Sequence, residues 1–303
     1  MSFNVIGIGE VLWDLLPEGQ QLGGAPANFA YHAHALGANA EIITRIGNDA
    51  RGREIVCHLR RLGLSVNGVQ VDETAPTGTV AVQVIADGVP EYIIHENAAW
   101  DQIHASREAT ALVQSAHAVC FGTLAQRNAG SRQSIQRLLA SASSGAWRVY
   151  DVNLRQNYFN REVIEHSLNF ANVLKCNDSE IPVLAQMFSL QGDVDQQMEV
   201  LAKRFGLQVV ALTCGAKGSV LYHKGQWSKR AAAPVKIKDT VGAGDAFTAA
   251  LCLGLLRDLE LDDINAAAAQ VAAHVCGCAG AMPRVPEELR QLLNPVPTAP
   301  TAH

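Results

Sequence analysis

The stretch DTVGAGDAFTAA, residues 239–250, places two glycines directly before a run of strong helix formers. A glycine-rich turn that leads into a helix exposes backbone N–H groups at the positive end of the helix dipole, and both features attract anions. The N–H groups of residues 242 to 245 are therefore expected to point at one anion. Asp245 needs an explanation, because its carboxylate stands at the mouth of this site and should repel phosphate.

Two interpretations of Asp245 follow from the residues alone. An acid in the first turn of a helix stabilises the helix dipole by about 0.3–1 kcal/mol and needs no further role. Alternatively, Asp245 takes the proton of an alcohol that attacks a phosphoryl group, while the N–H groups hold the transferred oxygens. A weak base suffices for this step, because the proton leaves late in a loose transition state. In the second interpretation the carboxylate faces an alcohol rather than the phosphate.

Composition excludes several classes of protein. The chain has 303 residues, of which 48% are hydrophobic and 17% charged, so it can bury a large core as one domain or one domain with an insertion. A net charge of −5 without any basic run makes nucleic acid an unexpected partner. Apolar stretches are strand-sized or interrupted by charge, and the N-terminus lacks a basic segment, so neither a membrane span nor a signal peptide is expected. Seven cysteines, an odd number, indicate reduced thiols in a cytoplasmic protein.

Short apolar runs that suit buried strands alternate with longer segments of helical spacing. The expected strands are 3–9, 40–47, 117–123, 147–153 and 208–215, and the expected helices are 26–37, 53–63, 131–142 and 246–256. A further β-prone run, VKIK at 235–238, leads into the glycine-rich turn. This alternation predicts an α/β protein, with a parallel sheet covered by helices on both faces.

Residues 77–95 break the alternation. They form two strand-like runs joined by a turn that contains Asp87-Gly88, with no helix between them. Such a hairpin either extends the edge of the main sheet or acts as a lid over a substrate. A two-stranded ribbon is marginally stable alone, so its apolar face needs the substrate-bound core or a second subunit, and we expect a homodimer through this element. The Pro/Thr/Ala-rich tail at 294–303 is expected to be disordered.

A second glycine cluster, GGAPAN at 23–28, also precedes a predicted helix. Asp14 lies ten residues before this cluster's second glycine, at the end of another strand-like run. Asp14 and Asn28 together offer acceptors and donors that suit neighbouring hydroxyl groups. Structural explanations stay open for both residues, since Asn28 could cap the helix and Asp14 could be a solvated acid at a strand end.

Two sequence motifs resemble those of a known family. GGAPANFAYHAHALG (23–37) and DTVGAGDAF (239–247) resemble the two signatures of the ribokinase/PfkB sugar kinases, and GEVLWDLLP (9–17) is most similar to bacterial fructokinases. The resemblance extends from about residue 5 to residue 290. It implies one ribokinase-like three-layer α/β/α domain over residues 1–293, with a mainly parallel sheet and a small β lid contributed by about 10–22 and 77–95.

The resemblance implies a role for individual residues. Asp245 matches the catalytic base of the family, and Gly242, Ala243 and Gly244 match its anion hole. The sugar contacts would be Asp14, Gly23, Gly24, Asn28 and Arg155, the last from the run DVNLR at 151–155. An N-x-x-E element that helps to organise Mg²⁺ and the phosphates of ATP matches Asn177 and Glu180, and the nucleotide-binding strand end matches Thr213 and Gly215. A loop for a monovalent cation such as K⁺ matches Asp239, the carbonyl of Val241 and Gly280.

The function that this resemblance implies is transfer of the γ-phosphoryl group of ATP to a sugar hydroxyl, with fructose as the sugar. An alternative is a 2-keto-3-deoxygluconate kinase, in which Arg155 would bind the acid carboxylate, or another PfkB sugar kinase. A rival of a different class is a catalytically weak, sugar-binding regulatory protein on the same fold. The chain departs from the family pattern at Val152, where many relatives have proline, and at Cys214, but neither change removes a chemical group.

Overall fold

A nine-stranded sheet forms the centre of the protein, whose structure is a computed structural model that describes residues 2–17, 19–84 and 90–294. The strand order is β13-β12-β11-β10-β9-β8-β1-β4-β5. All neighbours are parallel except β11, β12 and β13, which pair antiparallel at one edge. The strands are β1 (Asn4–Ile8), β4 (Asn39–Gly47), β5 (Val69–Asp72), β8 (Ala118–Gly122), β9 (Trp147–Asp151), β10 (Val173–Asn177), β11 (Val209–Thr213), β12 (Ser219–His223) and β13 (Gln226–Arg230).

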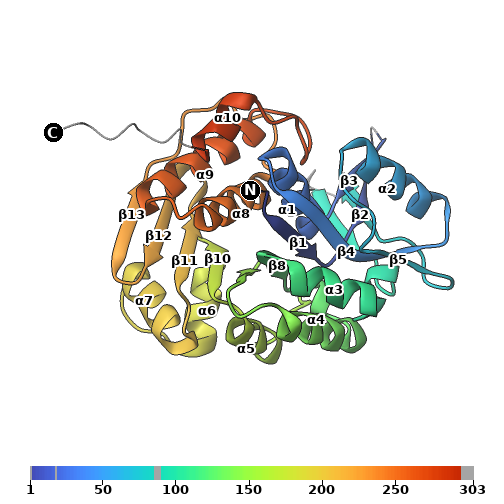
Figure 1. The fold of residues 1–303 in the computed structure, drawn as a ribbon, viewed down its shortest axis with the longest axis horizontal. Helices are drawn as coiled ribbons and strands as arrows, with labels where there is room; N and C mark the ends of the chain where they lie inside the picture. The colour runs from blue at the N-terminus through green and yellow to red at the C-terminus, as the bar shows by residue number, and fades with distance from the viewer. Residues whose placement is uncertain (1, 18, 85–89, 295–303) are drawn as a thin grey trace.

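Successive residues of the central strands enter two different hydrophobic cores, because side chains alternate across a sheet. Val149 and Val173 face one core and their neighbours Tyr150 and Leu174 face the other. The first core contains α1 (Ala25–Ala35), α2 (Ala50–Arg61), α8 (Ala243–Leu256) and α9 (Leu261–Cys276), beside which α10 (Glu287–Leu292) packs. The second contains α3 (Arg107–Ser115), α4 (Ala129–Ser141), α5 (Arg161–Phe170), α6 (Ile181–Phe188) and α7 (Val194–Phe205). The predicted three-layer architecture is confirmed (Figure 1).

The strands and helices expected from periodicity all form, with ends that differ by a few residues. The run VKIK at 235–238 is an exception, because it is not a strand. At the end of this run the backbone bonds to a helix end instead of a neighbouring strand. The N–H groups of Lys238 and Asp239 donate to the carbonyl of Cys276 at the end of α9, over 2.8 and 3.3 Å. Short 3₁₀ helices occupy three connections: η1 (Ala99–Gln102), η2 (Leu124–Gln126) and η3 (Gly215–Lys217). Within the described ranges, no helix has the length and hydrophobicity needed to cross a membrane.

A second sheet of four strands, in the order β3-β2-β6-β7, stands apart from the first. It is made of β2 (Leu12–Leu16), β3 (Gly19–Gly23), β6 (Thr79–Val84) and β7 (Pro90–Ile94). Because β6 pairs in parallel with β2, the alternative that residues 77–95 extend the main sheet is wrong. The turn with Asp87-Gly88 and the tail from residue 295 lie outside the described residues. That this small sheet closes over a substrate or joins two subunits stays a prediction.

Candidate active site

A cleft of about 1200 Å³ lies at the carboxyl ends of the parallel strands, where open α/β sheets bind their ligands. Its wall includes residues of the small sheet, the loops that follow β9, β10 and β11, and one side of α9. The structure brings most of the sequence-predicted site residues to this cleft. They are Asp14, Gly23, Gly24, Asn28, Arg155, Asn177, Thr213, Gly215, Asp239, Val241, Gly242, Ala243, Gly244 and Asp245; the exceptions are Glu180 and Gly280.

The first turn of α8 carries the residues of the expected anion site. Gly242 is its N-cap with φ of 80°, and a Cβ there would lie 2.6 Å from the carbonyl oxygen of Ala281, so only glycine fits. The N–H of Ala246 makes the first helical bond, 2.9 Å to Gly242, and the N–H of Ala243 approaches Thr240 O at 3.3 Å. Helix geometry therefore leaves the N–H groups of Gly244 and Asp245 without an intrahelical acceptor.

Asn28 joins the first turns of α1 and α8. Its Nδ2 donates to Oδ2 of Asp245 over 2.7 Å, although the two residues are 217 positions apart. The alternative that Asn28 caps a helix is wrong, because Gly24 is the N-cap of α1 and the N–H of Asn28 donates to Gly24 O over 2.9 Å. Asn28 is thus an interior helical residue whose side chain reaches the neighbouring helix.

Asp14 lies in the middle of β2, opposite Gln21 of β3, and not at a strand end as expected. A side chain at Gly23 would collide with the carboxylate of Asp14, so the glycine leaves the room that this group occupies. Burial raises the pKa of Asp14 to about 6, although the guanidinium of Arg155 lowers it. Asp14 is therefore held in the cleft wall and is not a freely solvated acid.

Asp245 is half-buried at the cleft surface. Burial and the negative charge of Asp151 raise its pKa to about 6, against the lowering effects of Asn28, Lys175 and Arg155. A carboxyl group with this pKa is mostly ionised at neutral pH and is a better proton acceptor than an ordinary aspartate. These properties suit a general base.

Sequence reasoning missed Glu10, which lies between β1 and β2 and lines the same cleft. Glu10 is 3% exposed, and burial raises its pKa to about 7. Its Oε2, like Oδ1 of Asn28, is buried and has no hydrogen-bond partner among the described residues. A signal existed, because Glu10 interrupts the otherwise apolar run VIGIGEVLW. Two buried oxygens without partners, on residues that line one cleft, mark a place where hydrogen-bonding capacity is unused.

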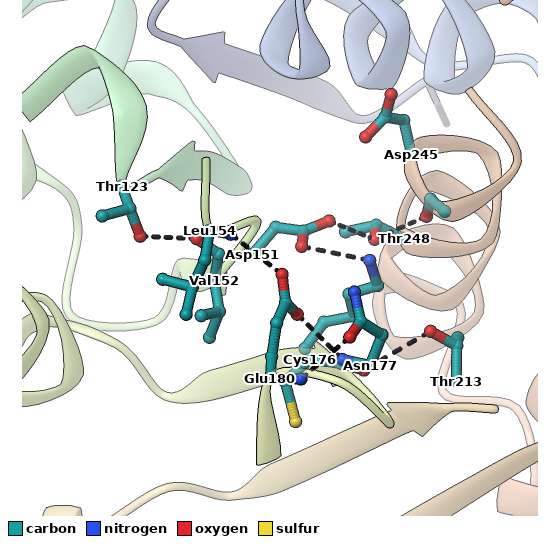
Figure 2. A network of polar contacts seen from close by, with 12 residues as sticks. Thr123, Asp151, Val152, Leu154, Cys176, Asn177, Glu180, Thr213, Asp245 and Thr248 are labelled. Carbon is teal, nitrogen blue, oxygen red and sulfur yellow. Dashed lines mark hydrogen bonds and ion pairs between the residues drawn. The ribbon is translucent and has the colours of Figure 1, made fainter. Parts of the chain in front are cut away.

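Glu180 does not line the cleft. Its Oε1 accepts the N–H of Leu154 and its Oε2 accepts the N–H of Asn177, each over 2.9 Å (Figure 2). The carboxylate thereby ties the loop after β9 to the end of β10, with 3% of Glu180 exposed. The side-chain oxygen of Asn177 accepts the N–H groups of Ser179 and Glu180, which holds this loop in a tight turn. Glu180 is therefore placed to shape the cleft indirectly, through these two loops.

Asp239 organises the loop that precedes α8. Its Oδ1 accepts the N–H of Val241 over 3.0 Å and its Oδ2 accepts that of Gly280, 41 residues away, over 3.1 Å. Each carboxylate oxygen retains a lone pair, so the loop can also hold a cation. Thr213, at the end of β11, approaches Cys176 O with its hydroxyl at 3.4 Å, and Gly215 begins η3. Among the residues that the structure describes, no group of three or more His, Cys, Asp or Glu side chains could hold a metal ion.

Comparisons with known proteins identify the family of the chain. The sequence profile of the pfkB family carbohydrate kinases matches residues 18–288. An uncharacterized sugar kinase of Pyrococcus horikoshii is 29% identical over 275 residues, 85% of this chain and 84% of its own. A fructokinase of Solanum tuberosum is 26% identical over 309 residues, 95% of this chain and 94% of its own.

Solved structures show the same fold. The crystal structure of the Pyrococcus kinase matches with a TM-score of 0.83 and 27% identity, over 96% of this chain and 99% of its own. The fructokinase of Xylella fastidiosa with bound ATP matches with a TM-score of 0.84 and 22% identity, over 97% of this chain and 99% of its own. Since the profile spans most of the chain and these structures share its ribokinase-like α/β fold, the chain belongs to the pfkB family of carbohydrate kinases.

Proposed function

We propose that this chain is a fructokinase that transfers the γ-phosphoryl group of ATP to a hydroxyl of fructose. The observation that carries the proposal is the carboxylate of Asp245, bound to Asn28 in the cleft at the N-terminus of α8. A Pyrococcus sugar kinase crystallised in complex with ATP, at 26% identity and a TM-score of 0.81, supports ATP as the donor. Fructokinases at 26–29% identity support the sugar. All seven cysteines are free, which supports a reducing cytoplasmic setting.

In the proposed reaction Asp245 removes the proton of the attacking hydroxyl as its oxygen bonds to the γ-phosphorus. The bond between the γ-phosphorus and the bridging oxygen breaks, and ADP leaves. The N–H groups of Gly244 and Asp245 donate to the transferred oxygens, where negative charge gathers. The hydrogen bond from Asn28 keeps the carboxylate turned toward the sugar. Base and anion site thus act on different partners.

The excess of acidic side chains in the cleft indicates that cations accompany the bound substrate. The carboxylates that line it are Glu10, Asp14, Asp178, Asp239 and Asp245, whereas Arg155 and Lys175 are the only cationic side chains in the described lining. An acid-rich cleft fits ATP that arrives with Mg²⁺, which is held mainly by phosphates and water. When bound, Mg²⁺ neutralises phosphate oxygens so that an alcohol can approach. The Asp239 loop would hold K⁺ beside the anion site.

The sugar end of the cleft favours a neutral polyhydroxy sugar. Glu10 Oε2 and Asn28 Oδ1 have no hydrogen-bond partner among the described residues, and both residues line the cleft, which suits a ligand rich in hydroxyl groups. A keto acid would bring another acceptor-only carboxylate next to Asp14 and Glu10. Arg155 is the one observation that favours a 2-keto-3-deoxygluconate kinase, because its guanidinium lines the cleft. Its Nη1 already donates to Leu154 O over 3.1 Å. Fructose is therefore the substrate that we propose.

Replacing Asp245 with Asn tests the role of the base. The amide keeps the shape but cannot accept the proton, so we expect kcat to fall by about 10²–10⁴-fold, with ATP affinity retained or improved. Asp263→Asn is a matched control, because Asp263 is an exposed acid in the first turn of α9 and should matter only to the helix dipole. Turnover of Asp245→Asn within about threefold of wild type would show that Asp245 is merely a helix-end acid.

The rate should depend on the ionisation of Asp245. Because its pKa is raised to about 6, the carboxylate dominates above that pH and the neutral acid below it. We expect kcat at saturating fructose and ATP to fall about tenfold for each pH unit below 6, since only the carboxylate takes the proton. Fixed-time assays of ADP release between pH 5 and 8 measure this pH dependence of kcat. A flat profile over that range would contradict general-base catalysis by Asp245.

Asp14→Ala tests the sugar end of the cleft. Loss of a partner for a sugar hydroxyl costs roughly 1–3 kcal/mol, so kcat/KM for fructose should fall about tenfold or more while KM for ATP stays near normal. Gln20→Ala, on β3 outside the cleft lining, is the control. ADP release measured with a panel of sugars, 2-keto-3-deoxygluconate among them, identifies the substrate. Preference for the keto acid would favour the alternative kinase, and no release with any sugar would favour a regulatory protein.

Potassium should raise activity by ordering the loop from Asp239 to Gly242, whose backbone leads directly into the anion site. We expect a higher rate in KCl than in NaCl or tetramethylammonium chloride at equal ionic strength and saturating Mg²⁺. Initial rates of ADP release measure the effect. Equal rates in all three salts would remove the potassium proposal and leave the kinase proposal intact.

A further inference from the structure

A buried ion pair lies next to the proposed active site but has no part in the reaction as written. Lys175, the middle residue of β10, and Asp151, the last residue of β9, are register partners on adjacent parallel strands. The ammonium nitrogen of Lys175 lies 3.1 Å from Oδ1 of Asp151, and each side chain is 7% exposed. Sequence reasoning did not single out Lys175, although it interrupts the apolar strand VLKCN.

The pair contacts the first turn of α8. The hydroxyl oxygen of Thr248 lies 2.9 Å from Oδ2 of Asp151 and 2.9 Å from the carbonyl oxygen of Gly244, so it can donate to either (Figure 2). A Cβ at Gly244 would lie 3.1 Å from the ammonium nitrogen of Lys175. The ammonium group therefore packs against the turn that carries the proposed anion site, and Lys175 also lines the cleft.

Stability alone is a weak reason for this pair. Taking two charges out of water is costly, and well-packed apolar residues often replace a buried ion pair without loss of stability. Burial lowers the pKa of Lys175, but the charges of Asp151, Glu180 and Asp245 outweigh burial and raise it, so the side chain is a cation at neutral pH. A fixed positive charge thus stands beside a carboxylate that must be ionised to act.

Several elements present charged, titratable or polar groups to Asp245. They are Glu10 before β2, Asn28 on α1, Cys120 on β8, Asp151 on β9, Arg155 on the following loop and Lys175 on β10. Asp151 raises the pKa of Asp245, whereas Lys175 and Arg155 lower it. Arg155 is exposed, so its charge is screened by solvent. Lys175 is the buried cation, which makes its charge the stronger influence.

We propose that Lys175 is a positioning residue for the proposed phosphoryl transfer. Clamped by Asp151 against the first turn of α8, its ammonium group keeps Asp245 in the charged form that accepts a proton. Asp151 anchors the lysine, and Thr248 connects the anchor to the helix. The inference rests on the proposed function, because it takes Asp245 as the base.

Three variants test the proposal through opposite shifts of one pH profile. Lys175→Met leaves the carboxylate of Asp151 uncompensated beside Asp245. The pH at which kcat is half-maximal should therefore rise by about one pH unit or more. Asp151→Asn leaves the ammonium group without its anion and should lower the pH at which kcat is half-maximal. The double variant removes both charges and should lie between the two single variants.

A matched control separates this effect from the breaking of a buried pair. Arg45 and Asp72 form such a pair, 2.9 Å apart, on β4 and the edge strand β5, away from the central strands β9 and β10. Arg45→Met should lower the unfolding temperature while the pH profile keeps its wild-type midpoint. A shift of that midpoint equal to the shift in Lys175→Met would overturn the proposal.

A second measurement needs no catalysis. Carbon-13 NMR of aspartate-labelled protein follows the Asp245 carboxyl, whose signal is assigned by its loss in Asp245→Asn. The expected order of midpoints is Lys175→Met highest, then the double variant, then Asp151→Asn. If Lys175→Met does not fold, the difference between the double variant and Asp151→Asn carries the same information, because these differ only at residue 175.

The outcomes are distinguishable from a failure of the proposed function. Identical midpoints for the folded variants, by NMR and by kinetics, would overturn the role of Lys175 while the wild-type enzyme still releases ADP. Full turnover in Asp245→Asn would instead remove the proposed base and with it this inference. Shifted midpoints in the expected order, with kcat following them and KM for fructose little changed, support the positioning role.

Discussion

The hydrogen bond between Asn28 and Asp245 joins the N-terminal turns of two helices that lie far apart in the sequence, and the site depends on it. It can form because α1 and α8 pack closely in one core, where both helices bury fully enclosed alanines such as Ala27, Ala30, Ala246 and Ala249. Small side chains let helix axes approach, and the approach brings both N-terminal ends to the carboxyl edge of the sheet. One contact therefore places the GGAPAN turn and the DTVGAGDAF turn around the same cleft.

Burial then determines the chemistry of the cleft. Asp14, Glu10 and Asp245 each lose part of their hydration, and their pKa values rise to about 6, 7 and 6. Few cationic side chains compensate them, so in the proposed reaction the phosphates would rely on backbone N–H groups at α8 and on cations that arrive with the substrate. Acceptors that suit sugar hydroxyls and donors that suit phosphate are thus supplied by different parts of the chain.

Much of the fold was predictable because its signals are local. Strands buried on both faces appear as apolar runs, and amphipathic or apolar helices follow them at regular intervals. An error arose where pairing is not local, because the run VKIK has the composition of a strand but the N–H of Lys238 bonds to the end of α9. Residues 77–95 do contain the two expected antiparallel strands, β6 and β7, and the partner of β6 in the small sheet, β2, comes from the N-terminal part of the chain.

The sequence by itself determined the candidate site residues and the turns that present them. Gly242 and Asp245 define a helix N-terminus with an acid in its first turn, and such a feature depends on neighbours within a few residues. Only the tertiary structure decided which of these groups contact one another. Asp14 within a strand, Asn28 inside a helix, the unpaired oxygen of Glu10 and the pair of Asp151 with Lys175 all follow from contacts between distant segments. Charge and desolvation depend on those contacts, because a carboxyl group titrates according to what surrounds it in space and not according to its neighbours in sequence.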